Sequence, residues 1–317
     1  MQVTPNPDLT SRFNAALVAL NVGSKDHILV AVSGGPDSVA LLLLAHAARP
    51  GQIIAATVDH QLRPESAEEA VYVANICARL GVSHIILTPD DPIKGNVQSS
   101  ARTARYALLN RVAETHHCLH IATAHHADDQ LETILMRLAR GSGVDGMSGI
   151  RARNGKIIRP LLGFAKEELV VLCNNAGIEP VSDPSNDNAD FARVAMRQYL
   201  ARANHPFRAD RATRTAAAIA EASDALAWMT DRLTQERVTV KNDEVSCDAS
   251  GLPAELKRRL LLRALAMMDP LLEPRGDAID LLLSKIESGV SSMIGDIVCT
   301  GGPHWRFARA PARRTGQ

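Results

Sequence analysis

Short apolar runs alternate with longer segments of helical period from residue 27 onward. The apolar runs end in polar residues and predict four β-strands, each followed by a helical stretch of twelve residues or more. A crossover connection between parallel strands needs about that length. The pattern therefore predicts an α/β fold with a parallel sheet and helices on both of its faces, with strands at residues 27–32, 53–59, 84–88 and 120–124.

The same pattern changes in the second half of the chain. Residues 156–159 predict a short fifth strand, and residues 164–175 a helix that ends before Gly177. Residues 191–240 then have a nearly continuous helical pattern, rich in Ala and Arg, which Pro206 interrupts. Alternating apolar residues over 292–310 predict a terminal hairpin.

These elements predict three parts along the chain. We expect a helical lead-in over residues 1–26, a sheet domain over 27–188, and a smaller, mainly helical domain over 189–317. The total of 317 residues agrees with two domains, since one domain usually has about 100 to 200. The sequence leaves the oligomeric state open, with a homodimer among the options.

Composition excludes several classes of protein. Hydrophobic residues make up 46% and charged residues 22%, so wholesale disorder and fibrous structure do not fit. The apolar run at residues 39–48 is far shorter than the roughly 20 residues of a membrane span, and residues 1–17 lack a signal-peptide pattern. We therefore expect a cytoplasmic protein. Its five cysteines form no CxxC pair, which favours reduced thiols in the core.

A loop with the chemistry of a phosphate site follows the first predicted strand. Its glycines let backbone N–H groups approach an anion, the following helix adds its positive N-terminus, and its hydroxyls can donate to oxyanions. A carboxylate would repel phosphate but is suited to hold Mg²⁺ between phosphates. We expect this loop to bind phosphate or pyrophosphate through Ser33, Gly34, Gly35, Pro36, Asp37 and Ser38, with Asp37 as the Mg²⁺ ligand. The loop resembles the pyrophosphate loop of N-type ATP pyrophosphatases, and this resemblance implies that the bound phosphates belong to ATP.

Two acids open the helix after the fourth strand. Asp129 and Glu132 are three residues apart and share one helix face, where they could grip Mg²⁺ or a cationic substrate. A zinc site made of His125, His126 and Asp129 is one alternative, and ordinary first-turn acids that match the helix dipole are another.

Residues 125–133, HHADDQLET, together with the phosphate loop, closely resemble the tRNA(Ile)-lysidine synthetase family. Further segments agree in order over about residues 27–200, namely VDHQLRPESA, ARTARY, GSGVDGMSGI, RPLL and DPSN. The resemblance implies a ligase that adenylates C2 of the wobble cytidine, position 34, in the CAU anticodon of an isoleucine tRNA. The lysine ε-amine then displaces AMP and gives lysidine, so that the anticodon reads AUA instead of AUG.

The resemblance also implies roles for particular residues. ATP and Mg²⁺ are the expected co-substrate and metal, and Asp129 and Glu132 are expected to receive L-lysine. His125 would assist the amine, and Arg105 would contact the α-phosphate or the RNA. Arg193 and Arg197 share a helix face and would contact AMP or anticodon phosphate, although Val194 stands where the family usually has Asn.

Local excesses of arginine favour RNA binding even though the net charge is zero. The expected tRNA contacts are Arg193, Arg197, Arg208, Arg211 and Arg214, and the basic tail after residue 301 is a further candidate. One alternative is a tRNA 2-thiolation enzyme of the same fold, which would want paired cysteines. The other is a tRNA-binding relative that has lost catalysis, against which Asp37, Asp129 and Glu132 argue.

Overall fold

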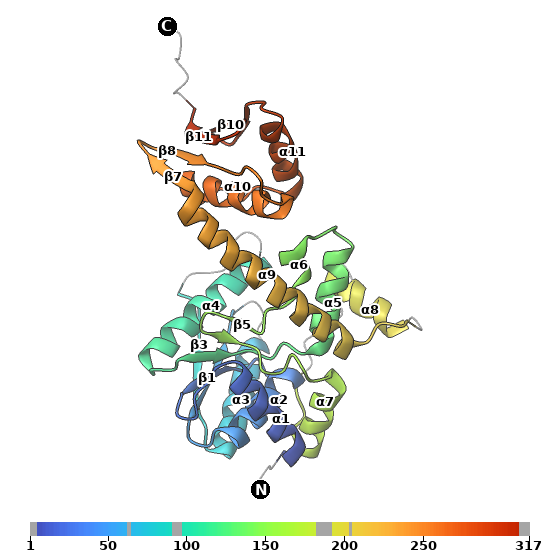
Figure 1. The fold of residues 1–317 in the computed structure, drawn as a ribbon. Helices are drawn as coiled ribbons and strands as arrows, with labels where there is room; N and C mark the ends of the chain where they lie inside the picture. The colour runs from blue at the N-terminus through green and yellow to red at the C-terminus, as the bar shows by residue number, and fades with distance from the viewer. Residues whose placement is uncertain (1–4, 62–64, 91–96, 182–191, 203–204, 311–317) are drawn as a thin grey trace. The chain divides into compact units, whose positions relative to one another are not determined.

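The computed structural model describes residues 5–61, 65–90, 97–181, 192–202 and 205–310. The chain forms two compact units that divide between Ala220 and Glu221 (Figure 1). The boundary at 188/189 expected from the sequence lies outside the described residues. Helix α8 (Ala192–Arg202) and the first part of α9 (Ala209–Arg237) group with the first unit, which is therefore longer than the sheet domain expected from the pattern.

A six-stranded sheet organises the first unit, in the order β3-β2-β1-β4-β6-β5. The strands from β3 to β6 pair in parallel, and β5 is an antiparallel edge. Their bounds are Ile28–Ala31 for β1, Ile53–Val58 for β2, Ser83–Leu87 for β3, His120–Ala122 for β4, Arg153–Asn154 for β5 and Ile157–Ile158 for β6. The predicted parallel sheet of about five strands is confirmed, while the pattern missed β5 because both of its residues are polar and exposed.

Helices cover both faces of this sheet because side chains of a strand alternate between the faces. Ile28 and Val30 of β1 pack in one core with four helices: α1 (Pro7–Ala19), α2 (Pro36–Ala48), α3 (Glu65–Leu80) and α7 (Lys166–Asn175). Leu29 packs in a second core with Leu109 of α4 (Val97–Thr115) on the other face. The predicted layering is thus confirmed, and α4 is the one described helix that contributes to that second core.

The functional segments leave the carboxyl ends of β1 and β4, which are neighbours in the sheet. The chain after β1 enters α2 through the phosphate loop, and the chain after β4 enters α5 (Ala127–Leu138). A short helix, α6 (Val144–Met147), follows α5, and the side chain of Gln130 bonds to both backbone groups of Ile150. Parallel strands thereby bring two loops, about ninety residues apart in sequence, to one edge.

The second unit contains an antiparallel sheet in the order β7-β8-β11-β10-β9, with helices α10 (Ala254–Met268) and α11 (Gly276–Glu287). The strands are β7 Val238–Lys241, β8 Glu244–Cys247, β9 Ser292–Ile294, β10 Ile297–Thr300 and β11 Trp305–Arg309. The predicted terminal hairpin is β10 and β11. The helix expected up to residue 240 ends at Arg237, where the unpredicted β7–β8 hairpin begins. Trp305 and Phe307 lie in the core of this unit.

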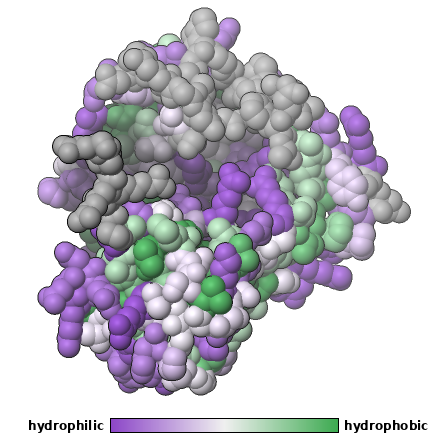
Figure 2. Space-filling view, turned by 90° about the horizontal axis from the view of Figure 1, so that it is seen from above, coloured by the Kyte–Doolittle hydropathy of each residue, from purple (hydrophilic) through white to green (hydrophobic). Residues whose placement is uncertain are grey.

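The face seen in Figure 2 interleaves hydrophobic residues with hydrophilic ones. Among the described helices, none combines the length and the apolar character that crossing a membrane requires.

Candidate active site

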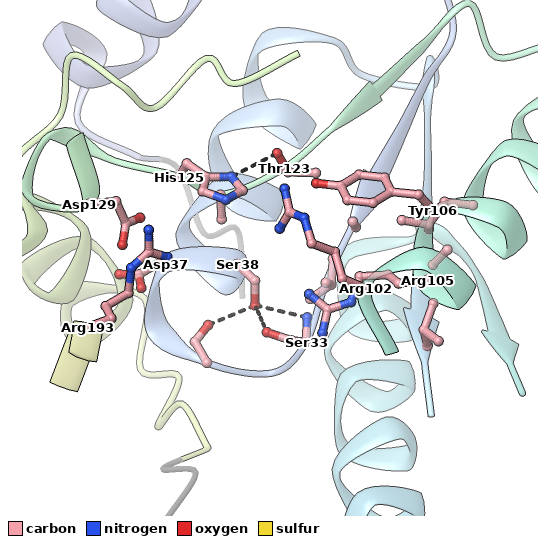
Figure 3. A pocket seen from close by; sticks show the side chains of 17 residues that line it. Ser33, Asp37, Ser38, Arg102, Arg105, Tyr106, Thr123, His125, Asp129 and Arg193 are labelled. Atoms are coloured by element: carbon pink, nitrogen blue, oxygen red, sulfur yellow. Dashed lines mark hydrogen bonds between the residues drawn. The ribbon is translucent and has the colours of Figure 1, made fainter. Parts of the chain in front are cut away.

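The phosphate loop joins β1 to α2 at the carboxyl end of the parallel strands (Figure 3). Gly34 has a φ of +92°, a conformation that L side chains rarely adopt, and its carbonyl accepts a hydrogen bond from the Val181 N–H at 3.0 Å. Ser38 Oγ accepts from the Ser33 N–H at 3.1 Å and donates to the Gly35 carbonyl at 2.9 Å. Gly35 is the N-cap of α2 and offers no side chain, so the helix N-terminus is open to an anion.

Asp37 lies in the first turn of α2 and provides a site for a cation. Its Oδ2 is 3.5 Å from His126 Nε2, whereas its Oδ1 is buried and has no hydrogen-bond partner among the described residues. A buried carboxylate oxygen without a partner is costly, and a hard cation would satisfy it. The carboxylate therefore fits the Mg²⁺ role expected from the sequence.

The start of α5 is fixed by a capping box. His126 is the N-cap, its Nδ1 accepts from the Asp128 N–H at 3.2 Å, and its own N–H donates to Asp129 Oδ2 at 3.1 Å. Asp128 Oδ2 in turn accepts from the Lys166 N–H at 2.8 Å, which ties α5 to α7. These bonds set the direction of Asp129, whose side chain is directed toward the cavity in Figure 3.

His126 is almost fully buried among carboxylates. Its Nε2 lies 3.5 Å from both Asp37 Oδ2 and Asp129 Oδ2. Burial acts to lower the pKa of His126, but contacts with Asp128 and Asp37 and the charge of Asp129 outweigh it and raise that pKa to about 10. The sequence analysis considered His126 only as a ligand of the alternative zinc site. Within the described residues, no three His, Cys, Asp or Glu side chains are arranged so that they could hold a metal ion.

His125 lies beside His126 in the chain but has the opposite environment. Its Nδ1 is 3.1 Å from Thr123 Oγ1. Burial is the largest cause that lowers the pKa of His125 to about 4, the charges of Arg159 and Arg102 add to it, and Asp129 opposes it. At neutral pH this imidazole is therefore uncharged and can accept a proton.

Glu132 is buried, and its carboxylate pairs with two arginines. Arg197 donates from Nε to Oε1 at 2.8 Å and from Nη2 to Oε2 at 3.2 Å, while Arg193 Nε lies 3.7 Å from Oε2 and its Nη2 donates to Thr133 at 3.0 Å. Arg197 also lies 3.9 Å from Asp129. The pair of acids expected to receive lysine thus forms a four-residue cluster with two arginines of α8. Val194, between them, is buried and apolar.

One face of α4 forms the opposite side of the site. Arg102, Arg105, Tyr106 and Leu109 recur at helical spacing and line the cavity, with the Arg102 guanidinium 5.0 Å from the Tyr106 ring centre. Burial lowers the pKa of Arg105, and the groups that influence it electrostatically, Tyr106 and Arg102, supply no carboxylate. Arg105 therefore presents a positive charge that suits a phosphate.

These elements enclose one cavity of about 250 Å³. Part of its wall is apolar, formed by Ala31, Ala56, Val58 and Leu109, and part is polar. In Figure 3, Asp37, Asp129 and Arg193 lie on one side, and Arg102, Arg105 and Tyr106 on the other. An apolar wall next to arginines and a phosphate loop can hold a flat base and its phosphates.

Most of the residues expected from the sequence meet at this cavity. Eight line it directly: Ser33, Gly35, Asp37, Ser38, Arg105, His125, Asp129 and Arg193. Glu132 and Arg197 lie behind Asp129. Arg208, Arg211 and Arg214 do not line the cavity and are exposed, and Arg208 and Arg214 pair with Asp210 at 3.1 and 3.7 Å.

The sequence analysis did not predict several residues of the site. Arg102 and Tyr106 follow the i, i+3, i+4, i+7 spacing with Arg105 and Leu109, so that helical pattern could have found them. Arg159 is 6% exposed and donates to the Arg151 carbonyl at 2.6 Å, and nothing in its local sequence indicates its burial. The role of His126 depends on Asp37, which is distant in sequence.

Comparison with known proteins places these features in a family. Residues 6–204 match the family model described as a PP-loop domain. The chain is 40% identical over 294 residues to the tRNA(Ile)-lysidine synthase of Zymomonas mobilis, covering 90% of this chain and 89% of that protein. It is 38% identical over 313 residues to the tRNA(Ile)-lysidine synthase of Novosphingobium aromaticivorans, covering 96% and 95%.

A solved structure supports the fold alone. The U34-tRNA thiolase NcsA of Methanococcus maripaludis superposes with a TM-score of 0.54 at 18% identity, over 68% of this chain and 77% of that one. The family model covers more than half of the chain, and the relatives match it almost from end to end. The chain therefore belongs to the PP-loop family and, within it, to the tRNA(Ile)-lysidine synthases.

Proposed function

We propose that this chain is a ligase that joins L-lysine to C2 of the wobble cytidine in the CAU anticodon of an isoleucine tRNA. ATP is the co-substrate, and AMP and pyrophosphate are the products. The observation that carries the proposal is one cavity lined by both the phosphate loop and Asp129, in a chain matched almost end to end by enzymes of that name. A reaction that uses tRNA, ATP and free lysine favours the cytoplasm.

The first step is attack of the cytidine O2 on the α-phosphate of ATP, with pyrophosphate as the leaving group. Backbone N–H groups of the loop at Gly34 and Gly35, and the start of α2, would hold the phosphates. Arg105 would offset the charge that develops on the α-phosphate. Mg²⁺, when bound at Asp37, would neutralise phosphate charge.

The second step is attack of the lysine ε-amine on C2, with AMP as the leaving group. Asp129 would orient the lysine, and the two acids and two arginines around it match the charges of a free amino acid. His125 is neutral at pH 7 because its pKa is lowered to about 4, so it can accept a hydrogen bond from the amine and pass the released proton on to solvent without retaining it. Arg208, Arg211 and Arg214 are exposed and would contact RNA phosphates.

Thiolation on the same fold is less well supported by the cysteines of this chain. All five are free and buried, and none lines the cavity. Burial raises the pKa of each thiol, to about 12 for Cys173, which disfavours the reactive thiolate.

The test is incorporation of labelled lysine into unmodified isoleucine tRNA with a CAU anticodon, with ATP and Mg²⁺, while pyrophosphate release is followed in parallel. Asp37→Ala should abolish both signals, whereas Glu132→Ala should weaken lysine use and leave some pyrophosphate release. Pyrophosphate release without lysine transfer in the unaltered chain would point to another nucleophile. Silence in both channels would favour a binding protein without catalysis.

A further inference from the structure

His126 connects the two halves of the proposed site. Its Nε2 lies 3.5 Å from Oδ2 of Asp37, on α2, and 3.5 Å from Oδ2 of Asp129, on α5. Its side chain is 3% exposed, so this nitrogen has no access to bulk water. The two carboxylates would repel each other without a positive or hydrogen-bearing group between them.

The hydrogen on Nε2 does not depend on the charge of the ring. The Asp128 N–H is 3.2 Å from Nδ1, and a neutral imidazole that accepts this bond carries its hydrogen on Nε2. A protonated imidazole carries a hydrogen on both nitrogens, and its Nδ1 would then donate to Asp128 Oδ2, 3.5 Å away, instead of accepting from the Asp128 N–H. In either form Nε2 presents a donor to Asp37 and Asp129.

We propose that His126 is a positioning residue that holds Asp37 and Asp129 in register through this Nε2–H. The proposal rests on the proposed function, in which Asp37 serves the phosphates and Asp129 receives lysine. His126 does not line the cavity. It couples α2, which would bind the nucleotide, to α5, which would bind the lysine. These two helices must be aligned because both steps act on the same cytidine.

A second role of His126, as the N-cap of α5, must be separated from this one. Two substitutions do so. In His126→Asn the amide oxygen can replace Nδ1 as the acceptor for the Asp128 N–H, because Asn is a preferred N-cap, but the side chain is too short to reach the position of Nε2. In His126→Gln the amide nitrogen reaches about that position, whereas Gln is a poor cap.

The expected result is that the two variants fail in opposite ways. His126→Asn should melt close to the unaltered chain but slow both pyrophosphate release and lysine transfer by roughly 100-fold, the scale expected for reactants displaced by about 1 Å. Its KM for lysine and the Mg²⁺ concentration for half-maximal rate should rise together. His126→Gln should melt lower but transfer lysine within about tenfold of the unaltered chain.

Unaltered rates in His126→Asn would overturn the proposal, and so would a His126→Gln variant as slow as His126→Asn. Calorimetric binding of Mg·ATP tests the Asp37 half of the proposal without tRNA or lysine, and His126→Asn should bind at least roughly tenfold more weakly. If the unaltered chain binds Mg·ATP more tightly than His126→Asn does but transfers no lysine, the proposed function fails and this coupling stands. Equal Mg·ATP affinity in all three chains would refute the coupling.

Discussion

At the residue scale, adjacent histidines have pKa values shifted in opposite directions. His125 faces Arg102 and Arg159, and its pKa falls to about 4, whereas His126 lies among carboxylates and its pKa rises to about 10. Burial acts to lower the pKa of both histidines. At His125 burial is the largest cause and the arginine charges add to it, whereas at His126 three carboxylates outweigh burial. One site therefore contains an uncharged imidazole next to an imidazole held among carboxylates.

The lowered pKa of His125 makes the stability of the first unit depend on pH. The unfolded chain binds a proton at His125 below about pH 6.5, but the folded chain does so only below about 4, so the stability is complete above pH 6.5 and is lost as pH falls toward 4. Between pH 7 and 4.5 the unaltered chain should lose about 2 to 3 kcal/mol more than His125→Asn. Urea unfolding followed by circular dichroism at both pH values measures this difference.

An exposed histidine provides the control for this prediction. His116 is exposed at the end of α4, and His116→Asn should follow the unaltered chain at both pH values. Parallel pH dependence in the unaltered chain and His125→Asn would show that His125 is charged in the folded protein.

At the element scale, the phosphate loop contains two glycines, and each is required for a different physical reason. Gly34 has a φ of +92°, and an added Cβ would lie 3.3 Å from Val181 Cγ2, whereas Gly35 has an ordinary φ of −70° and no neighbour closer than 4.0 Å. Gly34→Ala should therefore destabilise the first unit by about 1 to 2 kcal/mol. Gly35→Ala should leave its stability nearly unchanged.

The same pair distinguishes folding from binding. Gly35→Ala places a methyl group at the N-cap of α2, where backbone N–H groups would meet phosphate, so it should weaken Mg·ATP binding while the fold persists. Thermal unfolding and calorimetric titration of both variants give the answer. A Gly35→Ala variant with full affinity would mean that phosphate does not approach this backbone.

Helix α8 is held to α5 by a buried carboxylate. Glu132 is only 4% exposed in its side chain, and Arg197 supplies its two shortest bonds. Among the described residues, Arg197→Ala leaves this carboxylate with Arg193 at 3.7 Å as its remaining partner, which should loosen α8 by about 2 kcal/mol. Amide hydrogen exchange in α8 should then accelerate by roughly thirtyfold.

The exposed pair of Arg208 and Asp210 is the matched control, with side chains 65% and 58% exposed. Arg208→Ala should change exchange in α8 by less than about twofold, because exposed ion pairs contribute little. Equal acceleration in the two variants would show that Glu132 does not anchor α8.

The elements that the sequence predicted are those with a strong local signal. The parallel strands are apolar runs of three to six residues, apart from the short β6, and the phosphate loop is contiguous in sequence. Strand β5 has two exposed polar residues and no such signal. The β7–β8 hairpin does have one, since the β-branched residues of β7 precede Asn242 and Asp243, whose φ values of 48° and 60° suit a tight turn. It was missed because it follows a 29-residue helix with no Gly or Pro between them. Contacts such as His126 with Asp37 depend on the sheet bringing two distant loops together, which local pattern does not contain.

At the scale of the whole molecule, the chain has two units with separate cores. Phe13, Leu41 and Ile158 belong to the core of the first, and Leu260 and Phe307 to that of the second. Each core is built from residues of one unit only, so each unit has its own source of hydrophobic stabilisation. The proposed ATP site lies wholly in the first unit.

This division predicts that the two units unfold separately and that ATP stabilises only one of them. Both tryptophans, Trp228 and Trp305, lie in the second unit, so tryptophan fluorescence reports on that unit, whereas circular dichroism reports on both. Mg·ATP at about one hundred times its Kd should stabilise the first unit by roughly 2.7 kcal/mol and raise its transition in circular dichroism. The fluorescence midpoint should not move. A single transition that shifts equally in both signals would instead mean that α9, which runs from one unit into the other, couples them into one cooperative fold.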